Sequence, residues 1–260
     1  MMNLVKYEFY KARHSVLTYV IIGICCGLAL LFTSRDYIFD PIIPGTPNNI
    51  TGIFMNEVAD VGIAMIIIVG CYVIFSFGND LKQRCVNFEI LSGNSRLKVF
   101  CSHYLYTFLF SGSIITVSLV VGCCKYGITN LGIQIVKDWS YYLRTVLLIY
   151  LLSFAIISIC IIFSVVLKDT AKSTVAAFVF LFISCYIMAA LANSGAGGQM
   201  SAAYEKTTGL LLVYPAYLWR WGLNPNLSGL QIIFVVFVAL IWCAISFCIS
   251  NYLFCRTELR

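Results

Sequence analysis

Residues 79–98, with the sequence NDLKQRCVNFEILSGNSRLK, separate two long apolar runs and decide how the rest of the chain is interpreted. Asp80, followed three residues later by a glutamine, has the form of a capping box, which predicts the start of a helix. Gly93 stands where a left-handed helix C-cap favours glycine. The asparagine and serine that follow it can each cap the next helix. The stretch therefore predicts a short helix over residues 79–93, inside a loop.

This predicted loop helix has an apolar face. Leu81, Cys85 and Phe88 recur at positions i, i+4 and i+7, a spacing that places them on one side of a helix. A folded helix in a loop needs something to bury that side against. The candidates are the rest of the protein, the lipid surface and a partner.

The composition excludes a soluble protein. Of the 260 residues, 61% are hydrophobic and 11% are charged, and the mean hydropathy is +0.92. A soluble domain carries about 25% charged residues. Because too few polar residues are available to face water, the sequence predicts a polytopic membrane protein.

The apolar runs favour helices over barrel strands. A spanning helix needs about 20 apolar residues, whereas barrel strands would alternate over segments of about 10, and no such segments occur. No soluble domain fits between the runs, so residues 1–260 are expected to form one transmembrane domain. The predicted fold class is all-α, with six spans at residues 16–33, 61–77, 99–123, 139–167, 173–192 and 230–254.

The placement of charge predicts the orientation. Eleven of the 17 basic residues fall at the termini and in the second and fourth loops, and this side nets +6 while the other nets zero. Short basic loops stay in the cytoplasm, so both termini are expected there. The excess positive charge thus reflects topology, and it gives no support for nucleic-acid binding.

Motifs for catalysis are missing from the sequence. Neither G-x-x-x-x-G-K-[ST] nor H-E-x-x-H occurs, and charges are nearly absent from the middle of the spans, where ion-coupled carriers keep them. His14 and His103 lie near the inner membrane edge and are interpreted as structural. The 12 cysteines show no zinc-binding spacing, and a disulfide at Cys123 or Cys124 stays open. We therefore expect no catalytic residue, metal or cofactor in this chain, and any motor in another chain.

Two features of the N-terminal region concern packing. Residues 1–15 predict a helix that lies on the anionic inner leaflet. The alternative is that these residues only supply the positive charge that orients the first span. Gly23 and Gly27 form a G-x-x-x-G on the first span, which lets another helix approach closely. That helix can belong to the same chain or to a second copy.

The loop at residues 193–229 is the most unusual external feature. Its run GLLLVYPAYLWRW is apolar and aromatic but too short to span, which favours a re-entrant or interfacial segment. We prefer a broken hairpin that dips into the outer leaflet, and a loop resting on the headgroups is the alternative. The aromatic residues suit the membrane interface and the proline breaks the run; these residues are Tyr214, Pro215, Tyr217, Trp219 and Trp221.

The chain resembles the permease subunits of type-2 ABC exporters over nearly its full length. The opening MNLVKYEFYKARHS is similar to the family's interfacial helix. Arg84, Glu89 and the run Gly93-x-Ser95-Arg96 resemble the motif between its second and third spans, and the split outer hairpin is also similar. One departure is His103, which stands where many members have lysine.

The resemblance implies a partner and an assembly. The loop helix would be the coupling helix that seats on the ATPase, with contacts from Leu81, Arg84, Cys85, Phe88, Glu89, Gly93 and Arg96. Two ATPase copies, which hold ATP and magnesium, would join two permeases, either identical or sister chains. The first and fifth spans would meet across this dimer, at Gly23 and Gly27.

The expected setting is a bacterial plasma membrane, with outward movement of an amphipathic peptide, an antibiotic or a lipid-like substrate. That substrate class rests on analogy with small members of the family. The alternative is a non-transporting accessory or immunity protein that binds a peptide directly.

Overall fold

The computed structural model of the chain describes residues 2–32, 50–83, 85–124, 139–193, 213–222 and 228–256. Within these ranges the regular structure is helical, which confirms the predicted all-α class. The helices are α1 (Met2–His14), α2 (Val16–Phe32), α4 (Ile50–Lys82), α5 (Cys85–Leu91), α6 (Arg96–Cys124), α8 (Trp139–Leu167), α9 (Thr170–Asn193), α11 (Pro215–Trp221) and α12 (Gly229–Arg256).

Several helices are long and apolar enough to cross a membrane. Four meet that test alone, namely α6, α8, α12 and the Val61–Lys82 part of α4. A fifth is obtained if α1 and α2, which meet at a bend of 75°, form one broken span. The described part of α9 is apolar but shorter. The protein is thus a membrane protein with four or five candidate spans by length and composition.

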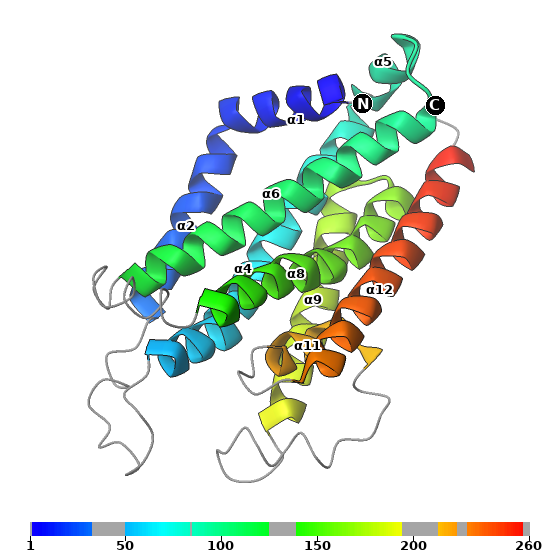
Figure 1. Ribbon diagram of the computed structural model, residues 1–260. Coiled ribbons are helices and arrows are strands. Elements are labelled where there is room, and N and C mark those ends of the chain that lie inside the picture. The colour runs from blue at the N-terminus through cyan, green and yellow to red at the C-terminus, as the bar shows by residue number, and fades with distance from the viewer. Residues whose placement is uncertain are drawn as a thin grey trace, which may run out of the picture.

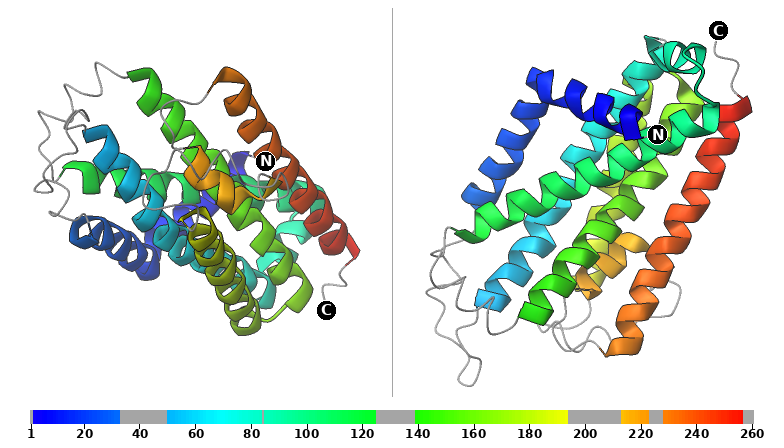
Figure 2. Two further views of the ribbon diagram at one scale, coloured as in Figure 1. Left: turned by 90° about the horizontal axis from the view of Figure 1, so that it is seen from below. Right: turned by 45° about the horizontal axis from the view of Figure 1, so that its top comes forward.

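The core lies around the middle of α8, where residues 152–158 are buried on all sides of the helix. It packs against α4, α6, α9 and α12, which surround it in Figures 1 and 2. Continuous apolar sequence suits this place, because a helix that is hydrophobic all round is buried. The largest fully buried aliphatic side chains include Leu152, Ile156 and Ile157 of α8 and Leu181 of α9.

The short helix α11 fills one end of the bundle. Pro215 is its first residue, where a missing N–H costs nothing. Tyr217 and Trp219 are only 1% and 2% exposed, and α11 packs against α8 and α9. The Trp219 ring lies so close to Gly62 that a Cβ there would sit 2.8 Å from it. These aromatic residues therefore face the protein interior, which corrects their expected position at the membrane interface.

The rest of the predicted hairpin is only partly described. The Tyr214 ring packs edge-on against Trp242, whose indole N–H donates to the Val213 carbonyl oxygen at 2.7 Å. These contacts favour a segment folded back into the bundle over a loop on the headgroups. The side chain of Trp221 and residues 194–212 lie outside the described part.

Helix α1 lies across one end of the molecule. It packs on α6, and its buried residues are Val5, Glu8 and Ala12. The predicted helix over residues 1–15 is therefore present, its buried face includes a glutamate, and its place at the inner leaflet stays a prediction. In Figure 1, α1, α5 and both chain ends gather at the upper end of the bundle. This end carries the candidate functional site.

Candidate functional site

The junction between α4 and α5 differs from the sequence prediction. Helix α4 continues to Lys82, so Asp80 lies in its last turn and does not cap a new helix. The reason is that Leu81 extends the buried face of Ile74 and Phe77 at helical spacing and packs on the core. The following helix α5 starts only at Cys85 and has seven residues.

The C-terminal end of α5 was predicted correctly. Gly93 has φ +92°, a left-handed conformation that favours glycine, and its N–H donates to the Ile90 carbonyl at 3.0 Å. Ser95 then caps α6, since its Oγ accepts from the Lys98 N–H at 3.3 Å. The loop between α5 and α6 is therefore a sharp, defined return.

The two faces of α5 have opposite environments. Val86 is fully buried, and Ile90 packs against the core. Phe88 and Leu91 point outward with 70% and 80% of their surface exposed. Residues three apart are neighbours on a helix surface, so these two form an apolar pair, which we call the α5 outer face.

The predicted shared face of Leu81, Cys85 and Phe88 is therefore wrong. Leu81 belongs to α4 and is directed into the protein, and Cys85 is half-buried. Leu91 was missed, although its spacing of three from Phe88 was the signal that could have found it.

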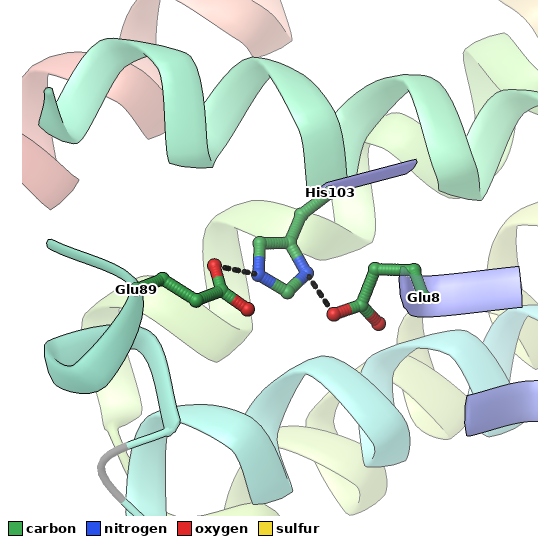
Figure 3. A group of neighbouring side chains, drawn as sticks. All are labelled: Glu8, Glu89 and His103. Atoms are coloured by element: carbon green, nitrogen blue, oxygen red, sulfur yellow. Dashed lines mark ion pairs between the residues drawn. The ribbon is translucent and has the colours of Figure 1, made fainter. Parts of the chain in front are cut away.

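A buried charged cluster lies beneath α5. His103 of α6 stands between two carboxylates from other helices (Figure 3). Its Nε2 is 3.3 Å from Glu89 Oε2 of α5, and its Nδ1 is 3.7 Å from Glu8 Oε1 of α1. The three side chains are only 4% to 11% exposed. Three helices that are distant in sequence thus meet at one imidazole.

A second ion pair adjoins this cluster. The Lys11 amine donates to the carboxylate of Asp80, whose side chain is 2% exposed, and it also lies 3.8 Å from Glu8. Burial raises the pKa of Glu8 above its ordinary value, although His103 and Lys11 oppose this shift. Burial also lowers the pKa of Lys11, but Asp80 and Glu8 outweigh it, so that this pKa is raised.

The geometry of the cluster fits a proton better than a metal ion. Glu8, Glu89 and His103 each offer a ligand atom within 4.8 Å of the others. The imidazole, however, turns a different nitrogen toward each carboxylate. A metal uses one nitrogen, so the second carboxylate would have to move around the ring to reach it. A doubly protonated imidazole has a donor on each side and needs no such movement.

The other residues predicted to contact the ATPase lie in different environments. Glu89 is directed inward to His103, and Arg96 donates from Nη1 to the Cys255 carbonyl of α12 at 2.8 Å. Arg84 lies outside the described residues. The cluster itself was missed, because His103 was interpreted as structural and no local pattern connects it to Glu8 or Glu89.

The glycines of α2 have no close neighbour. A Cβ built at Gly23 or at Gly27 meets nothing within 4 Å among the described residues. The G-x-x-x-G therefore makes no close helix contact within the described part of the chain. It is free to contact lipid or a second chain.

Residues 16–260 match a protein-family model that is described as a protein of unknown function, DUF2705. A comparison with curated proteins gave no match.

Proposed function

The chain belongs to the DUF2705 family, and we propose that it is the membrane-spanning permease subunit of an ATP-driven ABC exporter. The description of the family assigns no activity, so the proposal rests on the residues and geometry of this chain. In it, α5 is the coupling helix that contacts a separate ATPase subunit.

The α5 outer face carries the proposal. Phe88 and Leu91 are largely exposed although the opposite side of α5 is anchored by Val86 and Glu89. A short helix held from below, with an apolar pair directed outward, has the form of a helix that docks into a groove on a partner. The position of α5 at the same end as both termini supports a cytoplasmic partner (Figure 1).

The proposed assembly contains two permeases and two ATPases, with ATP and magnesium on the ATPases. Six spans belong to this proposal, with α2 as the first and α9 as the fifth. Both pack on α4, and in the left view of Figure 2 they lie along one edge of the bundle. Helix α2 contributes Gly23 and Gly27, and α9 contributes the exposed aromatic residues Phe178, Phe182 and Tyr186. These two helices form the proposed dimer surface.

The proposed substrates are amphipathic peptides, antibiotics or lipid-like molecules, which would be moved outward across a bacterial plasma membrane. A subunit of this kind acts by changing shape and contributes no catalytic residue, so its partner would supply the energy from ATP. The resemblance of the sequence to type-2 exporters supports this class, and the substrate assignment remains an analogy.

The test is purification of the tagged chain from its native membranes and detection of an ABC ATPase that co-purifies with it. Phe88→Ala with Leu91→Ala should weaken ATPase association at least about tenfold, because truncation of one buried interface anchor costs about 1–2 kcal/mol and 1.4 kcal/mol is tenfold. Phe237→Ala is the matched control, since Phe237 is 60% exposed on α12.

Insertion and folding should survive in both variants, because neither substitution removes a core side chain. Unchanged affinity in the α5 double variant would show that α5 is not the coupling element. Failure of the ATPase to bind the unaltered chain would favour the non-transporting alternative.

A further inference from the structure

We propose that protonated His103 is the bridge that seats α5 on the bundle, and that loss of this proton releases α5. This inference deepens the proposed function and rests on it in one respect: if α5 is the ATPase contact, coupling becomes pH-dependent. His103 is a positioning residue in this account, because it acts through α5.

The two nitrogens of His103 face two different helices. Nε2 faces Glu89 of α5, and Nδ1 faces Glu8 of α1. An imidazolium donates from both nitrogens, whereas a neutral imidazole has one donor and one lone pair. Neutral His103 would therefore direct a lone pair at one of the two carboxylates. When both carboxyls are ionised, only the charged form can donate to both.

The surroundings of His103 contain more negative than positive groups. Glu8 of α1, Asp80 of α4 and Glu89 of α5 act on it, and the Phe77 ring of α4 packs on the imidazole at 5.3 Å. Lys11 of α1 lies against Glu8 and Asp80. Lys11 is engaged by Asp80. Among the described residues, His103 is therefore the cation that faces Glu89. Two nearby carboxylates favour the charged imidazole.

Because the cluster is buried, loss of the His103 proton would leave a carboxylate without a cation in a place that water does not reach. Glu8 Oε1, Glu89 Oε2 and His103 Nε2 are all shielded from solvent and make no hydrogen bond of ordinary geometry. A buried carboxylate without a cation is strongly disfavoured. When His103 loses its proton, the simplest escape for Glu89 is to move α5 outward into water.

Helix α5 is short and has few buried apolar contacts, so it can leave the bundle when the charged cluster loses its bridge. It has seven residues, and Val86 is its one fully buried side chain. Its attachment therefore depends on little apolar contact besides the charged cluster. Elements with few buried apolar contacts belong to the low-stability part of a structure, where local opening occurs.

The direction of the pH effect follows from the charge. The side chain of histidine ordinarily has a pKa of about 6.5, and its charged form predominates below its pKa. The bridge is therefore present at acidic pH and is lost as the pH rises. A lysine at position 103 would keep its charge through this range.

The test is hydrogen–deuterium exchange of the purified chain in lipid nanodiscs, at pH 6 and pH 8.5, without the ATPase. The reporters are the amides at the end of α5, including Ser92 and Gly93, which donate to the Phe88 and Ile90 carbonyls. Variants are compared at the same pH, so that intrinsic exchange rates cancel. His14→Lys is the matched control, because His14 is an exposed histidine on α1.

We expect protection in the unaltered chain to fall at least about tenfold between pH 6 and pH 8.5 relative to His103→Lys, which stays protected at both. His103→Gln should be unprotected at both, and His14→Lys should behave as the unaltered chain. Equal protection of the unaltered chain and His103→Lys at both pH values would overturn the proposal. The comparison of the unaltered chain with His103→Lys tests the proposal even if His103→Gln fails to fold.

A second measurement separates this inference from the proposed function. ATPase association is titrated over the same pH range. If α5 opens with rising pH while the ATPase binds equally well at both, the bridge stands and the assignment of α5 as coupling helix falls. If α5 stays protected in the unaltered chain while its outer-face variant loses the ATPase, the proposed function stands and the bridge falls.

Discussion

The carboxylate of Asp80 is almost fully buried at the end of α4, and Lys11 of α1 supplies its positive partner. Removal of one member of a fully buried pair costs about 3–5 kcal/mol, because the other charge is left uncompensated. Lys11 keeps 34% of its side chain exposed, so water can partly replace it and the cost should be smaller.

We predict that Lys11→Met lowers the free energy of unfolding by about 1.5–3 kcal/mol, the range for loss of a hydrogen bond to a charged group. Chemical denaturation in detergent measures this loss. Lys6→Met, on an exposed position of the same helix, should have little effect. Asp80→Asn in the Lys11→Met background should recover part of the stability. Equal stability of the Lys11 and Lys6 variants would contradict the assigned pair.

The raised pKa of Glu8 gives stability a pH dependence of its own. A carboxyl whose pKa is raised on folding contributes stability that is present below its unfolded pKa and is lost as the pH rises through the folded pKa. Glu8→Gln removes this titration but keeps the shape. The stability of the unaltered chain relative to Glu8→Gln should therefore decline from pH 4 to pH 7. Thermal unfolding of both proteins at several pH values measures this difference, and a rising difference would contradict the burial effect.

At the scale of elements, α5 shows what local sequence could predict. Gly93 and Ser95 were identified because helix caps depend on neighbours in the chain. The start of α5 was placed too early because Asp80 suits a cap as well as it suits a buried pair with Lys11. That pair joins α1 to α4, and no local pattern reports it.

The second element with a testable surface is α2. A Cβ at Gly23 or Gly27 meets no described atom within 4 Å, so the described part of the chain makes no close contact that these glycines are needed for. We predict that Gly23→Leu with Gly27→Leu weakens permease dimerisation at least about tenfold, since small residues permit close helix approach and 1.4 kcal/mol is tenfold. Cross-linking in native membranes measures the dimer.

Gly229→Leu on α12 is the control, because a Cβ at Gly229 is also without a neighbour within 4 Å. Normal dimerisation of the α2 variant would place that face against lipid. Loss of dimer in both variants would show a general effect on folding instead.

At the scale of the whole molecule, composition predicted a membrane protein, and the length of the apolar runs predicted helices. The charged cluster was beyond this reasoning, since Glu8, Glu89 and His103 lie in three separate regions of the chain. Each has an ordinary local explanation, and only the packing of α1 and α5 on α6 brings the three together. The buried aromatic residues of α11 were misplaced for the same reason, because an aromatic residue suits a membrane interface and a core alike.

The number of membrane spans depends on whether α9 crosses the membrane. Near one end of α4, Gly78 lies against Thr170 and Ser173 of α9, and farther along, Gly70 lies against Leu181. Helix α9 therefore runs antiparallel beside the apolar part of α4. The described apolar part of α9, Thr170–Tyr186, is shorter than a candidate span, so whether α9 crosses the membrane is a matter for experiment.

The six predicted spans count α9 and α2 with the four helices that are long and apolar enough to cross a membrane alone, and six is an even number. An even number returns the chain to its starting side, in agreement with the position of both ends at one end of the bundle (Figure 1). Reporter fusions placed in turn after each predicted span should therefore alternate between outside and inside, beginning outside; the fusion points are Asp40, Ser92, Tyr126, Asp169, Ala203 and Arg260. Fusions after Asp169 and Ala203 decide whether α9 crosses, and equal signals from these two would show that it does not. An outside signal after Arg260 would make the number of spans odd and would remove the C-terminus from the side on which α5 is proposed to meet its ATPase.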